Sequence, residues 1–421
     1  MPLSFISSTV IERTKILSKF VSVQLAVKLL GLASGILLVR TLDKQEYAYF
    51  TIANTMQGTM NILADMGIGS GLSVIGGKVW QDRYRFGQLI NTALKLKRYI
   101  AVIAIVAIAP ILLWLLIGKG TSIIYAILIS IVVLVELQFM LSNGVLTVVP
   151  RLHSQLKQIQ TLDIIFVASR LGILWVAYLT FLNAAIAVFA SSIASGLQYF
   201  FLRFWIRDSI DIEAPVHPED SVVLLKIIKS QAPYFVFYCI QGQITIWLIS
   251  VFGNTQNIAE VGALGRLGVL FSIIGAVMNS IILPAFARCQ SIIQLRDRYW
   301  QIIGGFCLLA TIIVVFTAIF PKEIIWILGK QYTHLSQEVI LVVISAMTST
   351  LAATMWSINT SKAWVQDSWL IVVSTVITQI FLLLILDVHT VKGVITFGWF
   401  STFPTILVNG YMSYQGLQRG L

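Results

Sequence analysis

The chain has 421 residues, of which 57% are hydrophobic and 11% are charged, and its formal net charge is +11. Soluble domains contain roughly 25% charged residues, so this composition excludes a water-soluble fold. The mean hydropathy of +0.88 and the apolar runs that recur from end to end predict an all-α integral membrane protein. Basic residues sit in short segments between these runs and form no basic face, so no nucleic-acid partner is expected.

About 20 helical residues are needed to cross a hydrocarbon core about 30 Å thick. By this criterion the sequence predicts about twelve transmembrane helices. Their approximate ranges are 20–39, 47–67, 99–117, 121–142, 161–181, 184–203, 231–252, 258–284, 301–320, 335–358, 367–386 and 391–413. Most Lys and Arg residues fall in alternate segments between these ranges, and basic residues near span ends stay on the cytoplasmic side. The pattern predicts a multi-pass protein with both termini in the cytoplasm.

The chain divides into two similar halves around a polar, Pro-containing and acidic stretch. We interpret residues 206–229 as a cytoplasmic linker between an N-terminal six-helix lobe, 1–205, and a C-terminal six-helix lobe, 230–421. Short motifs recur in the same order in both halves: Glu46-Tyr47-Ala48 matches Glu260-Val261-Gly262, and Arg98-Tyr99 matches Arg298-Tyr299. Such a parallel repeat predicts a central cavity at the interface between the lobes.

Three cations lie inside predicted spans: Lys28, Arg170 and Arg266. A cation at the centre of a span costs about 2.5–3.5 kcal/mol, so it usually faces a partner or a wet cavity. We interpret the three as candidates for binding an anionic ligand. Two alternatives stay open: Arg170 can pair with Asp163, and Lys28 can extend its ammonium to the membrane surface.

Amide side chains mark the predicted cavity. The second span carries Asn54, Gln57, Asn61 and Asp65 at spacings that place them on one helical face, and Gln24 shares a face of the first span with Lys28. Such polar stripes would be unsatisfied against lipid, so they are expected to line an aqueous cavity or contact another helix. The candidate cavity-lining residues are Gln24, Asn54, Gln57, Asn61, Gln241 and Gln243.

Two intramembrane acids, Glu136 and Asp65, are candidates for carrying a coupling ion, although simple pairing with a cation would also explain either one. The cysteines lack metal-ligand spacing, and there is no hydrolase motif and no phosphate-binding loop for ATP. We therefore expect no metal, no cofactor and no enzymatic activity. Transport would then draw on a gradient such as H⁺ or Na⁺.

The chain resembles the multidrug/oligosaccharidyl-lipid/polysaccharide (MOP) exporter superfamily over its whole length, and most closely its polysaccharide-repeat-unit (Wzx-type, O-antigen) flippases. The motifs that carry the resemblance are Arg40-Thr41-Leu42 with Glu46-Tyr47-Ala48-Tyr49-Phe50, Asp65-Met66-Gly67-Ile68, Glu260-Val261-Gly262 with Arg266, and Leu283-Pro284 with Arg288. The family usually has glycine where Ala48 stands, and the two extra C-terminal spans of lipid II flippases are missing.

The resemblance implies a flippase that moves undecaprenyl-diphosphate-linked oligosaccharide repeat units across the bacterial inner membrane by alternating access. By that similarity Lys28 and Arg266, with Arg170 third, would bind the diphosphate. The sugar would be contacted by Gln24, Asn54, Gln57 and Asn61. The implied partners are the polyprenyl-diphosphate-linked glycan, membrane lipid, a polysaccharide polymerase and a chain-length regulator.

Three other functions are considered. A multidrug/cation antiporter of the same superfamily would favour acidic cavity residues, which the cationic bias disfavours. A membrane-embedded polysaccharide polymerase or ligase would need a large outer loop, and the outer segments between predicted spans are short. A non-transporting scaffold for glycan assembly is the third.

Overall fold

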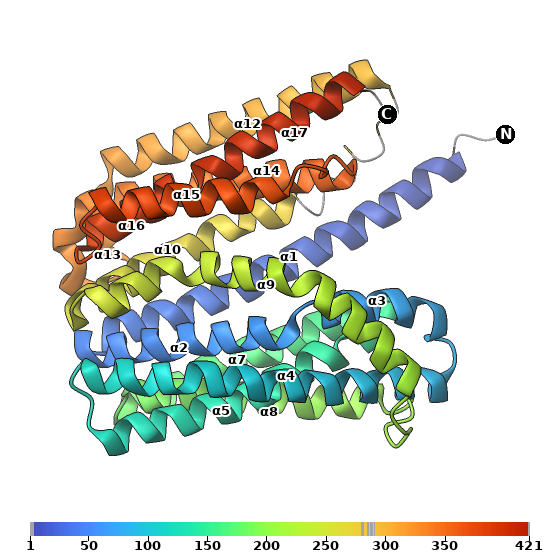
Figure 1. The fold of residues 1–421 in the computed structure, drawn as a ribbon, viewed down its shortest axis with the longest axis horizontal. Coiled ribbons are helices and arrows are strands. Elements are labelled where there is room, and N and C mark those ends of the chain that lie inside the picture. The colour runs from blue at the N-terminus through green and yellow to red at the C-terminus, as the bar shows by residue number, and fades with distance from the viewer. Residues whose placement is uncertain (1–3, 279–281, 284–285, 287–288, 290, 420–421) are drawn as a thin grey trace. The chain divides into compact units, whose positions relative to one another are not determined.

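The computed structural model describes residues 4–278, 282–283, 286, 289 and 291–419, with the side chains of 4–21, 269–270, 272–273, 276–277 and 419 left undescribed. Every element in this described part is a helix (Figure 1). The chain forms two compact units, Met1–Gln243 and Ile244–Leu421. We describe each by itself as the N-terminal and the C-terminal unit.

The N-terminal unit is a bundle of long helices that lie side by side (Figure 1). Helix α5 packs against α8, α2 against α4, and α7 against both α1 and α8. The helices are α1 (Ser4–Thr41), α2 (Lys44–Asp65), α3 (Ile68–Val79), α4 (Arg83–Gly118), α5 (Ile123–Leu146), α6 (Val148–Leu152), α7 (Leu156–Thr180), α8 (Ala184–Ile206) and the first part of α9 (Pro218–Phe252). Helix α9 bends along its length, as Figure 1 shows, and Pro233 lies inside it.

The second predicted span ends at a break between α2 and α3, which meet at an angle of 42°. Met66 and Gly67 at the break have φ values of 32° and 90°, in the left-handed region that favours glycine. A Cβ at Gly67 would also collide with the side chain of Gln231 in α9. Backbone geometry and close packing therefore both explain the Asp65-Met66-Gly67-Ile68 motif.

The polar stretch after α8 runs across the first turns of α4. The amide of Asp211 donates to the carbonyl of Arg83 at 3.0 Å, and the Arg83 guanidinium donates to the carbonyl of Arg207 at 2.9 Å. A Cβ at Gly87 would collide with the carbonyl of Asp211, so glycine allows this close approach. Part of the predicted linker is therefore attached to the N-terminal unit.

Side chains of α4 hold the rest of this stretch. The Asn91 amide donates to the carbonyls of Ile212 and Ala214, at 3.0 and 2.7 Å. Two helical turns earlier, Arg85 forms a bidentate ion pair with Asp220 in the first turn of α9, at 2.6 and 2.7 Å. Bidentate pairing is the strongest geometry available to an arginine and a carboxylate.

The C-terminal unit contains the end of α9 and a second helical bundle. Its elements are α10 (Thr255–Val277), α12 (Ile292–Ile319), α13 (Pro321–Trp326), the 3₁₀ helix η2 (Lys330–Leu335), α14 (Ser336–Ser361), α15 (Trp369–Ile385), α16 (Val391–Phe400) and α17 (Phe403–Arg419). Helix α14 packs against α10, α12, α16 and α17.

A fully buried amide joins α14 to α17. The Asn359 amide donates to the backbone and side-chain oxygens of Asn409, both at 3.0 Å, and its own oxygen accepts from the Ser413 hydroxyl at 2.7 Å. Asn359 and Asn409 are both 0% exposed. These amides satisfy one another between helices, as expected for polar groups away from water.

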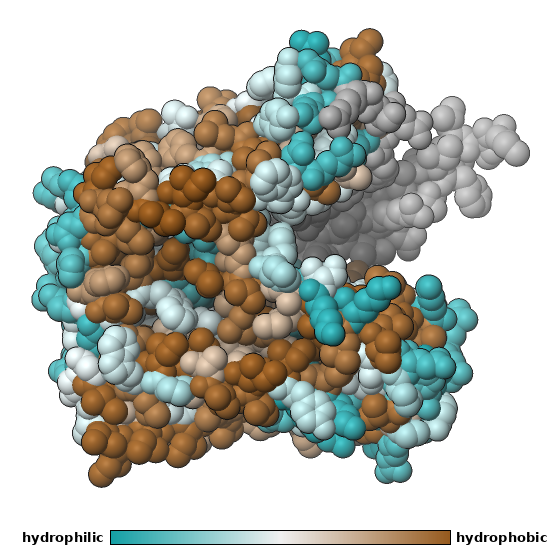
Figure 2. Space-filling view, in the orientation of Figure 1, coloured by the Kyte–Doolittle hydropathy of each residue, from teal (hydrophilic) through white to brown (hydrophobic). Residues whose placement is uncertain are grey.

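The predicted all-helical, multi-span fold class is confirmed, and each of the twelve predicted spans overlaps a helix. In the described part, nine helices are long and apolar enough to cross a membrane, and the bent pair α2–α3 makes a tenth. Hydrophobic side chains cover much of the visible face in Figure 2, and hydrophilic ones gather toward its edges. Pro284 and Arg288 of the predicted motifs lie outside the described residues.

Candidate functional site

A buried acid lies at the centre of the N-terminal unit. Glu136 in α5 is 5% exposed, and the groups that act on its carboxylate are the Gln57 amide from α2 and the Arg170 guanidinium from α7. Among the described residues, Glu136 Oε2 and Gln57 Nε2 complete no hydrogen bond with good geometry. Buried polar atoms are normally hydrogen-bonded, so this cluster has capacity for a proton, a cation or water.

The predicted polar stripe of α2 divides between two environments. Asn54 is exposed and Asn61 is partly exposed, whereas Gln57 is buried against Glu136. At about 100° per residue, Asn61 and Asp65 lie within about 20° of Asn54 around the helix, while Gln57 lies about 60° away. Gln57 thus faces the interior of the unit, and the other three occupy a more accessible face.

Asp65 forms an ion pair that the sequence analysis missed. Its Oδ1 lies 2.8 Å from Nζ of Lys97 in α4, whose side chain is 4% exposed against 35% for Asp65. A Cβ at Gly144 in α5 would come within 2.9 Å of this ammonium, so glycine leaves room for it. The predicted spans leave Lys97 outside the membrane, just before the span at 99–117; α4 begins at Arg83, which places Lys97 well inside a helix. The sequence signal that could have revealed this ion pair is the position of Lys97, two residues before the apolar run that begins at 99.

The candidates on α1 and α7 lie in a contact between these helices. Gln24 donates to Asp163 Oδ2 at 3.2 Å, so in this structure its amide has a helix partner. Lys28, one turn later, is partly buried. Asp163, which was considered as the partner of Arg170, accepts a hydrogen bond from Gln24, and Arg170 acts on Glu136.

The glutamines of α9 are partly buried near the end of the N-terminal unit. A Cβ at Gly58 in α2 would lie 3.5 Å from Gln243 Nε2, which places this amide beside α2. One turn earlier, Cys239 is buried with its Sγ 3.7 Å from the carbonyl of Thr59. Gln243 therefore lies beside α2.

Arg266 lies on α10 of the C-terminal unit and is partly buried. Lys28 belongs to the other unit, so the prediction that both cations face one cavity stays a prediction. The same holds for the role of the amides in contacting sugar.

A groove of about 840 Å³ lies between the end of α10 and α12 in the C-terminal unit. Its polar lining comes from α12 and includes Gln294, Asp297, Arg298 and Gln301. In the sequence, Arg298 stands out only as part of the repeated Arg-Tyr motif. The spacing of Gln294, Asp297, Arg298 and Gln301, at three, one and three residues, is the helical signal that could have revealed this face.

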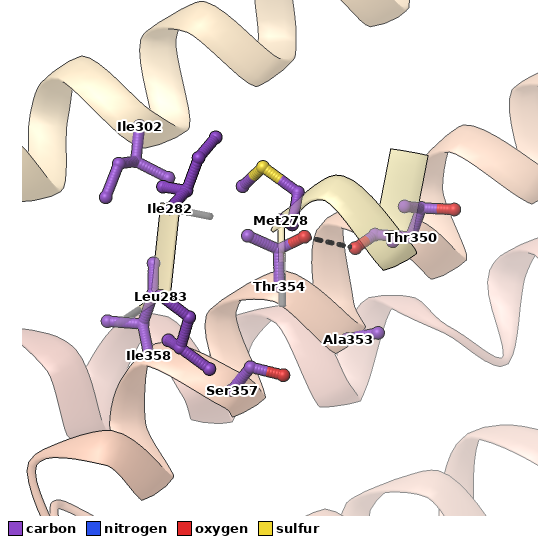
Figure 3. Close-up of a pocket in the computed structure, with 10 residues that line it drawn as sticks. Met278, Ile282, Leu283, Ile302, Thr350, Ala353, Thr354, Ser357 and Ile358 are labelled. Atoms are coloured by element: carbon purple, nitrogen blue, oxygen red, sulfur yellow. Dashed lines mark hydrogen bonds between the residues drawn. The ribbon is translucent and has the colours of Figure 1, made fainter. Parts of the chain in front are cut away.

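A smaller pocket of about 40 Å³ lies deeper between α10, α12 and α14. Met278, Ile282 and Ile302 enter it in Figure 3, and the Thr354 hydroxyl donates to the carbonyl of Thr350 at 2.8 Å. A volume of roughly 10–15 Å³ accommodates one water. This pocket is therefore too small for a sugar and is suited to a few waters at most.

Within the described residues, no group of three His, Cys, Asp or Glu side chains is placed to hold a metal ion. The polar groups that the structure brings together are instead a carboxylate, amides and cations inside apolar helices. Such an arrangement can bind and release a proton or cation and can contact a charged, hydroxyl-rich ligand.

No family model and no curated protein sequence matches the chain. Solved structures do match its fold. A lipid II flippase, MurJ, in an inward closed conformation, aligns with a TM-score of 0.73 at 13% identity, over 94% of this chain and 87% of that one.

Two further matches are structures described as transporters of the MOP superfamily. An inward-facing multidrug resistance MATE family transporter aligns with a TM-score of 0.68 at 15% identity, over 94% of this chain and 98% of that one. A MOP superfamily transporter from Pyrococcus furiosus, described as having a binding pocket of reverse polarity, aligns with a TM-score of 0.59 at 16% identity, over 96% and 94% of the two chains. The helical architecture of this chain is therefore similar to the fold of these MATE and MurJ structures.

Proposed function

We propose that the protein is a flippase that moves an undecaprenyl-diphosphate-linked oligosaccharide repeat unit between membrane leaflets for surface polysaccharide assembly. The observation that carries the proposal is the placement of cations on apolar helices of a MOP fold. Lys28 lies on α1 and Arg266 on α10, both away from helix ends and both partly buried. A diphosphate is a chemically suitable ligand for such cations.

The neighbourhood of Arg170 in the N-terminal unit changes the role that we propose for this residue. This residue acts on Glu136, so its charge is partly balanced inside its own unit. We therefore assign the diphosphate to Lys28 and Arg266 and give Arg170 the role of tuning Glu136. The partly accessible amides Asn54 and Asn61 remain proposed sugar contacts.

The Glu136–Gln57–Arg170 cluster is the proposed site of ion coupling. A buried carboxylate beside an arginine can exchange a proton or Na⁺ between two states of the transporter. Asp65 is less suited to this role, because Lys97 already balances its charge at 2.8 Å. Glu136→Gln is expected to uncouple transport from the gradient and leave the protein folded.

Reconstitution into vesicles with a fluorescent undecaprenyl-diphosphate oligosaccharide tests the substrate directly. The measurement is the rate at which the labelled glycan becomes accessible on the opposite side. We expect the Lys28→Ala, Arg266→Ala double variant to slow this rate by at least about tenfold, since each lost contact to a charged group is worth about 1.5–3 kcal/mol.

The matched control is the Lys322→Ala, Lys392→Ala double variant, which removes the same charge from two exposed positions. Its rate is expected to equal that of the unchanged protein. Full-rate flipping by the Lys28, Arg266 variant would remove both residues from diphosphate binding. Failure of the unchanged protein to move the glycan would exclude the flippase function.

The second candidate is a multidrug/cation antiporter, which the similarity in fold to a multidrug resistance MATE transporter supports. Glu136 would then bind the organic cation or its counter-ion. Gradient-driven uptake of a fluorescent organic cation by the same vesicles, lost in Glu136→Gln, would favour this function. A polymerase, ligase or scaffold would show neither transport activity.

The proposed setting is the bacterial inner membrane, with both termini in the cytoplasm. A polysaccharide polymerase and a chain-length regulator would act on the glycan after it has crossed. A tag that is accessible only from the cytoplasmic side at either terminus would support this orientation.

A further inference from the structure

A cavity of about 160 Å³ opens on the N-terminal unit where α4, α5 and α8 meet the stretch after α8. Its floor is apolar and is formed by side chains from all four segments, namely Ile90, Leu94, Leu146, Ile206, Ile210 and Ile212. Its polar groups are Arg98 on α4, Tyr199 and Arg203 on α8, and the flanking Asn91 and Ser142. No acidic side chain lines it.

The polar groups of this cavity offer hydrogen-bond donors. Arg203 Nη1 donates to the Tyr199 hydroxyl oxygen at 2.8 Å, so the hydroxyl proton of Tyr199 can be donated to another acceptor. In the part of the chain that the structure describes, no carboxylate pairs with Arg98 or Arg203. Asn91 is occupied with the carbonyls of Ile212 and Ala214. Two guanidinium groups and one phenol thus remain to receive an anion.

The cavity lies at the edge of the apolar surface that the helices present to lipid. On α4, Arg98 is followed by the exposed Tyr99, Val102 and Ile103. On α8, Arg203 lies between the exposed Phe200 and Phe204. On the other side of Arg98, α4 carries the exposed Lys95 and the turns that bind the polar stretch. This change from apolar to polar surface is typical of the headgroup region of a bilayer.

The attached stretch after α8 gives the cavity a defined floor. Ile210 and Ile212 line the cavity together with the two arginines. Their stretch is held where the Asn91 amide donates to the Ile212 carbonyl and the Asp211 amide donates to the Arg83 carbonyl. Ile210 is 2% exposed, and it packs in the same core as Ile90 and Ile206. The cavity is therefore built by tertiary contacts between segments more than a hundred residues apart.

We propose that this cavity binds the phosphate of an anionic phospholipid headgroup, with Arg98, Arg203 and Tyr199 as donors and the acyl chains along the exposed apolar residues of α4 and α8. Basic pockets between transmembrane helices at the headgroup level bind anionic lipids in this way. The proposed diphosphate cations, Lys28 and Arg266, take no part in the cavity. This lipid site is independent of the transported substrate.

Binding of dansyl-labelled phosphatidylglycerol to the purified full chain in detergent tests the proposal. The Arg98→Gln, Arg203→Gln double variant is expected to weaken binding by about 30-fold, since each basic group near an anionic lipid raises the affinity about fivefold. Arg98→Lys with Arg203→Lys keeps the charge and should recover part of the affinity. Thermal unfolding of each variant checks that it is folded.

The matched control is Lys95→Gln with Arg207→Gln, which removes two exposed charges from the same two chain regions. This control should bind the lipid like the unchanged protein. Equal weakening in both double variants would mean general surface attraction and would overturn the site. Competition by inorganic phosphate as effective as that by unlabelled phosphatidylglycerol would overturn the lipid assignment, and equal binding of phosphatidylcholine would do the same. Weak competition by inorganic phosphate together with weak binding of phosphatidylcholine supports it.

Discussion

The two compact units use the same motif acid in different ways. Glu46 in α2 accepts from the backbone amide of Ala184 and from the Tyr125 hydroxyl, both at 2.7 Å, so it caps the first turn of α8. Its counterpart Glu260 in α10 lies 2.8 Å from a ring nitrogen of His334, whose side chain is half exposed. The repeat therefore preserved the acid and its helix position, while the partner changed from a buried helix end to a half-exposed surface side chain.

The same motif acid can therefore contribute different amounts of stability in the two units. Hydrogen bonds from a helix N-terminus to a carboxylate combine hydrogen bonding with the helix dipole. An exposed histidine can replace its partner with water at little cost. The N-terminal unit is accordingly expected to be the more sensitive of the two to loss of charged groups.

The largest expected effect concerns the ion pair between α2 and α4 in the N-terminal unit. Asp65→Asn leaves the Lys97 ammonium buried without its carboxylate and is expected to cost about 3 kcal/mol of unfolding free energy. Lys97→Met leaves Asp65, which is 35% exposed and can be hydrated, so it should cost about 1 kcal/mol. Detergent-induced unfolding of the purified variants gives both values.

The double variant Asp65→Asn, Lys97→Met completes the cycle and should recover most of the loss caused by Asp65→Asn alone. Equal cost for the two single variants would show that the burial of Lys97 does not control this pair.

An intermediate effect is expected at the motif acids themselves. Glu46→Ala removes the acceptor for the Ala184 amide and the Tyr125 hydroxyl, which should lower the unfolding free energy by about 2–3 kcal/mol. Glu260→Ala in the C-terminal unit should cost less than half as much, because His334 is then hydrated. Thermal unfolding of the two variants compares them, and a larger loss for Glu260→Ala would reverse the ranking of the units.

The smallest effect is expected for the partners of these acids. His334→Ala should change the unfolding free energy by less than about 1 kcal/mol, because the ring is half exposed. Tyr125→Phe in the N-terminal unit is the matched variant and should cost more, since its hydroxyl also accepts from the Ala185 amide at 3.3 Å. Similar melting temperatures for the two variants would contradict the comparison.

Much of the architecture could be predicted because transmembrane helices are encoded locally. Runs of about 20 apolar residues predicted twelve spans, each of which overlaps a helix, and the Asp65-Met66-Gly67-Ile68 motif lies at the break between α2 and α3. The side-chain pairings were harder. The predicted stripe on α2 treated Gln57 as equivalent to Asn54, although a rotation of about 60° places it against Glu136.

Other parts of the site depended on helix boundaries that hydropathy does not reveal. Helix α4 begins at Arg83, some 16 residues before the predicted span at 99, so Lys97 lies on a packed helix and meets Asp65. The stretch after α8 was interpreted as a linker, and its attachment to α4 through Gly87 and Asn91 carries no local signal.

The sequence alone indicated that this protein lies in a membrane, where its apolar spans fall and which polar residues those spans carry. These properties follow from the cost of exposing polar groups to lipid, which acts residue by residue along the chain. Only the tertiary structure decided that Lys97 neutralises Asp65, that Glu136 meets Gln57 and Arg170, and that two arginines border an apolar cavity beside the attached stretch. Such pairings depend on helix rotation and close approach between distant segments, which packing sets and composition does not.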